Sequence, residues 1–134
     1  MKAMVYEKYG SPDVLKVAEI PTPSPKDGQV LIRVSAVSVG FGDLIARDFK
    51  SVTPRQFNMP WLLWLVSKLS FGLRQPNVTV LGSEFSGVVE AIGKDVTRFK
   101  PGDPVFGFPG SSFGAYAEYL VMPESGPLAH KPSN

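Results

Sequence analysis

Hydrophobic and polar residues alternate most regularly over residues 30–37. One face of this segment is apolar and the other carries Arg33 and Ser35, as in a half-buried strand. The apolar face consists of Val30, Ile32, Val34 and Ala36. Apolar runs at residues 4–6 and 14–20 predict two more strands, which pair antiparallel because the loop between them is rich in turn-forming residues. The first part of the chain is therefore predicted to be mainly β.

Three further strands are predicted in the second half of the chain. Residues 88–92 alternate between β-branched and other residues and are bounded by glycines. The segment 101–103, Pro-Gly-Asp, supplies a fixed φ followed by a residue free to take a positive φ, which predicts a turn before a strand that starts at Val105. The last strand is predicted over residues 115–122. One of its faces carries Ala117, Tyr119 and Val121.

A short helix is predicted after Asp43, because apolar residues follow it at helical spacing. These residues are Leu44, Ile45 and Phe49. An aspartate in this place can accept hydrogen bonds from the free N–H groups of the first helical turn. Asp43 is therefore a candidate helix cap.

Residues 59–72 are predicted to form a helix of about three turns, because Pro60 suits its start and Gly72 its end. Its first half is apolar all round and includes Trp61 and Trp64. It is too short to span a bilayer, which takes ~20 apolar residues. A lid over a substrate cleft or a contact with a neighbouring domain is favoured, and an interfacial membrane helix is the alternative. In this chain we expect the helix to be partly exposed, paired with another copy or disordered.

The composition indicates one globular domain in a reducing compartment. The chain has 134 residues, of which 43% are hydrophobic and 19% charged, enough for a single core. Its 14 basic and 12 acidic residues are spread along the chain, which argues against a nucleic-acid partner. Cysteine is absent, which excludes disulfides and thiolate metal sites and fits the cytoplasm. No signal peptide is expected, since Glu7 and Gly10 interrupt any early apolar run.

The glycine-rich stretch at residues 82–108 contains a long pattern at fixed spacing, G-x-E-x-x-G-x-V-x-x-I-G-x-x-V-x-x-F-x-x-G-D-x-V-x-G. Its residues are Gly82, Glu84, Gly87, Val89, Ile92, Gly93, Val96, Phe99, Gly102, Asp103, Val105 and Gly107. The stretch resembles the medium-chain dehydrogenase/reductase superfamily, whose catalytic domain carries such a pattern with a valine in place of Ile92. The opening of the chain and the segment GAYAEYLVMP also resemble the family. The resemblance implies a mainly β, GroES-like, partly open barrel with a few short helices over residues 1–134, and a Rossmann-type nucleotide-binding domain after residue 134.

The resemblance also implies which residues line the cleft between those two domains. Gly40-x-x-Asp43 stands where zinc-dependent members have Cys-x-x-Asp, and Gly82-Ser83-Glu84 stands where they have Gly-His-Glu. Both usual zinc-ligand positions are thus replaced, and without cysteine and with a single histidine the usual site cannot be assembled. We therefore expect no zinc and a zinc-independent, quinone oxidoreductase-like member. The candidate cleft residues are Gly40, Phe41, Asp43, Ser83 and Glu84.

The roles of the two acidic cleft residues stay open. Asp43 is equally compatible with a helix cap and with a residue that faces the cleft. For Glu84, a structural carboxylate that accepts backbone or arginine hydrogen bonds is favoured over a catalytic one. Trp61 and Trp64 are the candidates for a lid or an interface. No catalytic residue is assigned.

The implied activity is direct hydride transfer from NADPH or NADH to a quinone, an enone or a related carbonyl acceptor. The chain has no G-x-G-x-x-G fingerprint, so the cofactor is expected to bind mainly to the following domain, and the chain alone is expected to be inactive. The alternatives are an NAD(P)-dependent alcohol dehydrogenase domain and a non-enzymatic GroES-like binding module. The expected partner is a small-molecule electron acceptor. Membrane association is disfavoured, and a homodimer of the longer protein stays open.

Overall fold

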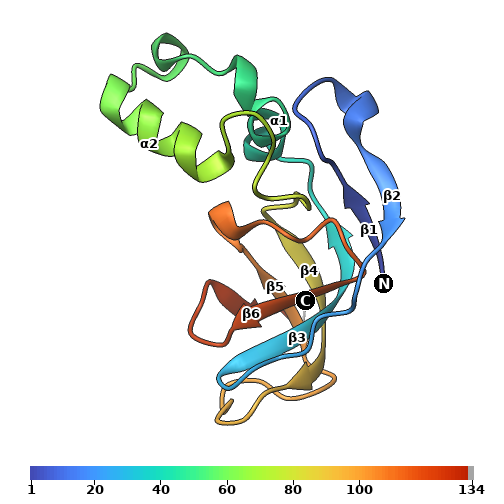
Figure 1. Ribbon diagram of the computed structural model, residues 1–134. Coiled ribbons are helices and arrows are strands. Elements are labelled where there is room, and N and C mark those ends of the chain that lie inside the picture. The colour runs from blue at the N-terminus through green and yellow to red at the C-terminus, as the bar shows by residue number, and fades with distance from the viewer. Residues whose placement is uncertain (133–134) are drawn as a thin grey trace.

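An antiparallel sheet of five strands curls around the larger of two apolar cores (Figure 1). The computed structural model describes residues 1–132, so Ser133 and Asn134, the end of the predicted domain, lie outside the described residues. The strand order is β6-β3-β4-β5-β7. The strands are β3 (Gln29–Val37), β4 (Phe85–Ile92), β5 (Pro104–Gly107), β6 (Tyr119–Pro123) and β7 (Leu128–His130). This curled, mainly β fold agrees with the predicted partly open barrel.

The alternation in β3 holds from Ile32 to Ser35 but not at Leu31, which is buried between Val30 and Ile32 next to a shift in the pairing with β4. Val30 and Ile32 are fully buried, and Arg33 is exposed, as predicted. Ala36 was predicted on the buried face, and that is wrong, because Ala36 is exposed. Between Val34 and Ala36 the pairing with β4 shifts by one residue, and such a bulge ends strict alternation and bends the strand. The core that this sheet encloses contains Val30, Ile32, Phe85, Val89, Phe99, Val105, Ala115, Leu120, Met122 and Leu128.

Gly87 allows β3 and β4 to approach closely at the centre of the sheet. A Cβ atom at this position would lie 2.3 Å from the carbonyl oxygen of Arg33 and 2.9 Å from Cγ2 of Ile32. No side chain fits at that separation. Gly87 was predicted to bound the strand 88–92, and instead it lies inside β4, which begins at Phe85, because packing requires a glycine there.

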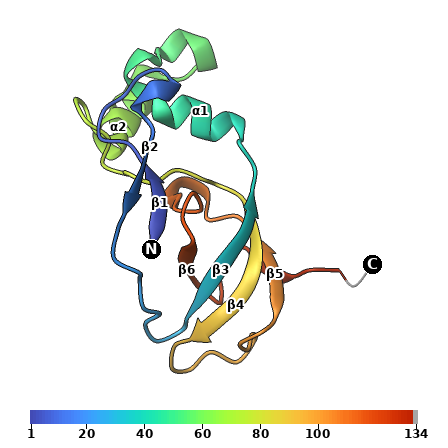
Figure 2. The same cartoon turned by 90° about the vertical axis from the view of Figure 1, so that its right-hand side faces the viewer.

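The predicted antiparallel pair at the N-terminus is confirmed. It consists of β1 (Lys2–Val5) and β2 (Lys16–Glu19), which form a separate two-stranded sheet beside the curled one (Figure 2). Between this pair and the helices lies the smaller core. Its buried residues are Tyr6, Val14, Ala46, Leu81 and Phe113.

Two α-helices interrupt the sheet between β3 and β4 (Figure 1). They are α1 (Phe41–Arg47) and α2 (Trp61–Phe71). Gly72 ends α2 with a φ of 103°, as its place in the sequence predicted. Four short 3₁₀ helices complete the elements of the described part, at Pro12–Val14, Phe49–Ser51, Pro54–Phe57 and Gly110–Ser112. Within residues 1–132, no helix has the length and apolar character to cross a membrane.

The strand predicted over residues 115–122 begins later, at Tyr119. Ala115 and Tyr116 donate backbone hydrogen bonds to Gly82 and Leu81 instead, and the Tyr116 carbonyl accepts one from Met4. These residues therefore join β1 to the turn before β4. A local apolar run cannot reveal such pairing with distant segments.

Candidate functional site

Asp43 is buried at the start of α1, where it ties the helix to the turn before β4. Its Oδ2 atom accepts a hydrogen bond from the Gly40 N–H at 2.9 Å, and its Oδ1 atom accepts one from the Gly82 N–H at 3.0 Å. The Ser83 hydroxyl donates to Oδ2 at 3.5 Å. Asp43 is only 2% exposed, so these bonds replace water around the carboxylate. The helix was predicted to follow Asp43, but α1 begins at Phe41, and Asp43 caps it from the third helical position by accepting from the N-cap residue Gly40. Asp43 also holds a segment 39 residues away in sequence.

The glycine at position 82 makes this connection possible. Gly82 has a φ of 97°, and a Cβ atom on it would lie 2.6 Å from the backbone nitrogen and the ring of Tyr116. A side chain is therefore excluded by both backbone conformation and contact. The close approach lets the Gly82 N–H reach Asp43 while the Tyr116 ring covers the turn.

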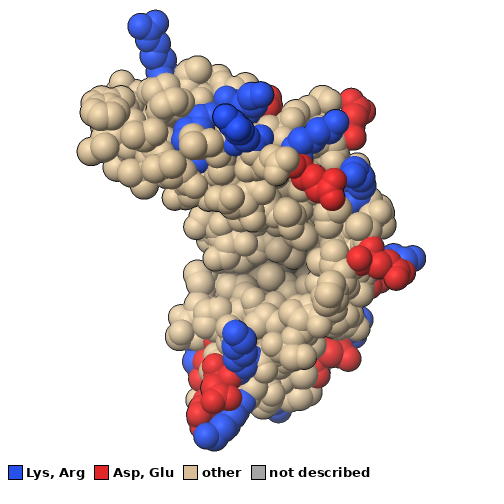
Figure 3. All heavy atoms as spheres, in the orientation of Figure 1, with Lys and Arg blue, Asp and Glu red and all other residues tan. Residues whose placement is uncertain are grey.

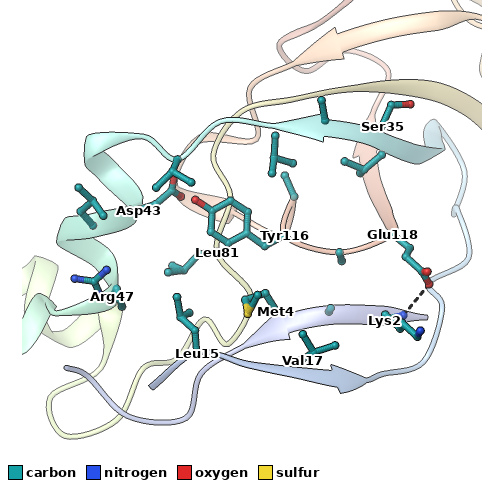
Figure 4. A pocket seen from close by; sticks show the side chains of 18 residues that line it. Lys2, Met4, Leu15, Val17, Ser35, Asp43, Arg47, Leu81, Tyr116 and Glu118 are labelled. Carbon is teal, nitrogen blue, oxygen red and sulfur yellow. Dashed lines mark hydrogen bonds between the residues drawn. The ribbon is translucent and has the colours of Figure 1, made fainter. Parts of the chain in front are cut away.

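Tyr116 is a residue of this site that the sequence did not indicate. Its hydroxyl donates to the Ser38 carbonyl at 3.3 Å and lies beside Asp43 (Figure 4). Burial, and after it the charge of Asp43 and a hydrogen bond to it, raises the pKa of Tyr116 to about 12. The hydroxyl therefore keeps its proton at neutral pH. Its place next to Asp43 depends on the irregular backbone at residues 115–117, which the strand prediction did not contain.

Asp43 and Tyr116 lie at one end of a largely apolar groove, and Lys2 and Glu118 lie at its other end (Figure 4). The groove has a volume of about 570 Å³ and lies between the β1–β2 pair, β3 and α1. Its apolar walls include Leu15, Val34, Val37, Leu44 and Leu81.

The predicted cleft residues do not all meet in one place. Gly40, Asp43 and Ser83 do come together, since a Cβ atom at Gly40 would lie 3.3 Å from Oδ2 of Asp43 and 3.7 Å from Oγ of Ser83. The side chain of Glu84 turns away to accept a 2.6 Å hydrogen bond from the Ser38 hydroxyl, beside a second cavity of about 780 Å³. Phe41 is 69% exposed on α1.

Ser38 lies between the two cavities and makes a hydrogen bond on the side of each. Its carbonyl accepts from Tyr116 on the side of the first groove, and its hydroxyl donates to Glu84 on the side of the second. Glu84 therefore accepts a hydrogen bond from a serine 46 residues away in sequence, and this hydroxyl takes the place of the backbone or arginine donors expected for it. No pattern in the sequence indicated this role for Ser38.

Comparison with known proteins decides the family. The family model described as "Alcohol dehydrogenase GroES-like domain" matches residues 26–133. The chain belongs to this family. The GroES-like domain is 34% identical over 121 residues to a trans-enoyl reductase of Fusarium mangiferae, and the match covers 90% of this chain and 25% of that protein. It is 36% identical over 122 residues to a quinone oxidoreductase of Sus scrofa, which covers 90% of this chain and 31% of the relative.

A solved structure shows the same fold. The mycobacterial protein Rv1454c, solved in complex with NADPH, is 30% identical, with a TM-score of 0.72 over 100% of this chain and 34% of that one. The predicted membership of the medium-chain dehydrogenase/reductase superfamily, close to its quinone oxidoreductases, is confirmed. The GroES-like domain spans about a quarter to a third of the length of the curated relatives it matches.

Positions 40 and 83, which correspond to two zinc-ligand positions of zinc-dependent family members, are adjacent in this GroES-like domain, but neither residue suits the metal. Gly40 has no side chain, and the Ser83 hydroxyl is bonded to Asp43. Zinc sites in proteins use cysteine, histidine and carboxylate ligands, in sets of three or four. Among residues 1–132, no group of three such side chains lies close enough to hold a metal ion.

The two tryptophans of α2 have different surroundings. Trp61 is 69% exposed, whereas Trp64 is partly buried and donates from Nε1 to the Val52 carbonyl at 3.1 Å. The expectation that the apolar helix is partly exposed in this chain is therefore confirmed. A role of this helix as a lid or an interface stays a prediction.

Proposed function

We propose that this chain is the substrate-side domain of an NAD(P)H-dependent reductase that acts on quinones, enones or related carbonyl compounds without zinc. The relatives named quinone oxidoreductase and trans-enoyl reductase support the reaction class. The neighbour solved with NADPH supports a nicotinamide cofactor. We further propose that a Rossmann-type domain follows residue 134 and binds most of the cofactor, since the relatives are three to four times as long as their matched part.

The observation that carries the proposal is the meeting of positions 40 and 83. They are close enough for two ligands of one metal ion, yet they hold a glycine and a serine whose hydroxyl is already bonded. An alcohol dehydrogenase needs a strong electrophile to polarise its alcohol, and this pair does not supply one. A quinone or an enone is already electron-poor and can accept a hydride without a metal.

In this proposal the chain shapes one wall of the reaction cleft. When bound, the nicotinamide cofactor supplies the hydride. Asp43 is a positioning residue, because it fixes the start of α1 against the turn of Gly82 and Ser83. Gly40 has no side chain, so Asp43 and Ser83 can pack against its backbone. Phe41, exposed beside it, offers an apolar contact to a flat acceptor. The protein thus orients the reactants and excludes water from them.

The test compares this chain with the longer protein that contains it. NADPH oxidation with a quinone and with an α,β-unsaturated ketone is followed by absorbance for both. The longer protein should turn over, and the 134-residue chain should not, because nicotinamide contacts alone give affinities on the order of millimolar. Alcohol oxidation as the dominant activity of the longer protein would contradict the proposal, and so would a ring-shaped oligomer with no oxidoreductase activity.

A further inference from the structure

The outer face of α2 is an apolar surface that nothing in the described part of the chain covers. Six of its eleven residues are large, hydrophobic and exposed. They are Trp61, Leu62, Leu63, Leu65, Val66 and Leu69, and Phe57 and Leu73 extend the surface at the two ends of the helix. An apolar surface of this extent on a folded protein marks an interaction site.

This face is held outward by two polar contacts on the opposite side of the helix. Trp64 donates to the Val52 carbonyl, and Lys68 donates to the carbonyls of Phe49 and, at 2.9 Å, of Lys50. The ammonium group of Lys68 also lies over the Phe49 and Trp64 rings, 5.0 and 5.5 Å from their centres. The contacts fix which side of α2 is buried, so the exposed apolar face is a defined surface of the fold.

The segment that carries α2 contains basic residues and no acidic ones. Between Asp48 and Glu84 it holds four of the 14 basic residues and none of the 12 acidic residues of the chain. The rest of the chain therefore has ten basic and twelve acidic residues, a net charge of −2, although the whole chain carries +2. In the space-filling view, the end of the molecule that carries α2 shows mostly uncharged and basic atoms, with a small acidic patch beside the basic ones (Figure 3).

Three of these basic residues lie on the segments that flank α2 in the sequence, at positions 50, 55 and 74. Lys50, Arg55 and Arg74 are exposed, while Lys68 is the buried anchor. A surface that combines exposed tryptophan and leucine with basic residues is complementary to an anionic lipid headgroup layer over an apolar interior. It is poorly suited to a second copy of the same face, because two-fold pairing would bring the basic residues together.

We propose that α2 and its basic surroundings dock on an anionic phospholipid surface. In this arrangement α2 lies in the plane of the membrane interface, with Trp61, Leu62 and Leu65 among the acyl chains. Arg55 and Arg74 contact the phosphate and carboxylate groups of the lipids. The proposal does not depend on the proposed enzymatic function, since it concerns only this surface.

Co-sedimentation of the purified 134-residue chain with two kinds of vesicle tests the proposal. One kind is pure phosphatidylcholine, and the other is phosphatidylcholine and phosphatidylserine in roughly equal amounts, which has a strongly negative surface. The chain should sediment with the anionic vesicles and only weakly with the neutral ones, and added salt should release it. The emission of Trp61 should shift to the blue on binding. Circular dichroism of each protein confirms that it is folded.

Matched variants separate the contributions of charge and apolar contact. Arg55→Gln with Arg74→Gln should lower partitioning on the order of 20-fold, because each basic residue near such a surface changes it about fivefold. Lys94→Gln with Lys100→Gln removes the same charge at the other end of the sheet and should leave binding unchanged. Leu62→Gln with Leu65→Gln should abolish binding, whereas Val17→Gln, an exposed apolar residue of β2, should not.

Three results would overturn the proposal. One is the absence of sedimentation with either vesicle, and another is equal sedimentation with both. The third is a concentration-dependent dimer that Leu62→Gln with Leu65→Gln dissociates and that binds no vesicles, which would assign the face to a second copy. The same assay on the longer protein should give the same preference for anionic vesicles, and loss of binding there would show that the rest of the protein covers α2.

Discussion

The curled sheet and the helical segment between β3 and β4 are stabilised in opposite ways. In the sheet, apolar side chains point into a common core and charged ones such as Arg33 and Glu90 point out. In α2, a lysine and an indole N–H hold the buried side, and leucines and a tryptophan face outward. The sheet therefore obeys the usual relation between hydropathy and burial, and α2 departs from it except at Phe71, which stacks on Phe49 beside the smaller core.

The residues that stabilise the fold and the residues that are available for a partner therefore lie in different regions of the molecule. Hydrophobic burial stabilises the sheet, so its apolar residues are needed for folding. The exposed residues of α2 contribute little to folding and are available for a partner. Substitutions should therefore have large effects on stability where the two regions are joined and in the sheet, and small effects on the outer face of α2.

The largest loss of stability is expected for Asp43→Ala, which cuts the connection between the helical segment and the sheet. The Gly40 and Gly82 N–H groups would lose a buried charged acceptor, at a cost of roughly 3–5 kcal/mol in the free energy of unfolding. Urea denaturation measures this cost. The control, Glu90→Ala, removes a half-exposed partner of Arg33 and should cost less than about 1 kcal/mol. Equal losses of stability in Asp43→Ala and Glu90→Ala would show that Asp43 does not hold the two regions together. If Asp43→Ala leaves stability unchanged but lowers the turnover of the longer protein, Asp43 is a cleft residue alone.

The centre of the sheet should be nearly as sensitive at Gly87. In Gly87→Ala the new methyl group would meet the Arg33 carbonyl and Ile32, so β3 and β4 must separate at a cost of about 2–3 kcal/mol. Gly42→Ala provides the contrast, because a Cβ atom there has nothing within 4 Å and alanine favours a helix by roughly 0.5–1 kcal/mol. Thermal melts of both variants check the prediction. A stable Gly87→Ala variant would contradict the close packing.

The smaller core should lose stability at alkaline pH because of Tyr6. Burial, and after it the charge of Tyr9, raises the pKa of Tyr6 to about 12, above its value near 10 in the unfolded chain. Between about pH 10 and 12 the unfolded chain binds fewer protons than the folded one, so stability falls by about 2–3 kcal/mol as pH rises. Tyr6→Phe should remove this contribution to the pH dependence of the free energy of unfolding, which is measured by denaturation at several pH values. The contribution of Tyr116 should remain. If the free energy of unfolding falls equally with pH in the unchanged protein and in Tyr6→Phe, the pKa of Tyr6 is the same in the folded and the unfolded chain.

Within α2 itself, the buried polar side should matter more than the exposed apolar side. Lys68→Met leaves the carbonyls of Phe49 and Lys50 without their donor and should cost about 1–2 kcal/mol. Leu69→Gln, next to it on the exposed face, should change stability by less than about 0.5 kcal/mol. Chemical denaturation of both variants makes the comparison. A larger cost for Leu69→Gln than for Lys68→Met would contradict the pattern described for α2.

The sheet could be predicted from the sequence because its elements are local patterns. Alternation located β3, the glycine-bounded run located β4, and proline and glycine placed the ends of α2. These signals depend on neighbours within a few residues, and the structure departs from them at the register shifts of β3 and at the first residues of β4 and β6. The short strand β7 was not predicted.

The site was predicted only in part, because its remaining contacts join distant residues. The family pattern pointed to Asp43 and Ser83, and they do meet. Tyr116 and Ser38 were missed, since each depends on backbone pairing that no local pattern records. The burial of Lys68 was missed as well, because a lysine in an apolar helix normally extends to solvent, and here two carbonyls of the preceding turn accept its hydrogen bonds.

The claim that this domain serves a zinc-independent reductase is tested most directly by the metal content of the active longer protein. The protein is purified without chelators, its NADPH-dependent reduction of a quinone is recorded, and zinc is measured in the same sample by elemental analysis. Gly40 and Ser83 cannot replace the cysteine and histidine of a zinc site, so turnover should accompany much less than one zinc ion per chain. One tightly bound zinc ion per chain, with activity lost when it is removed and regained when it is restored, would contradict the account.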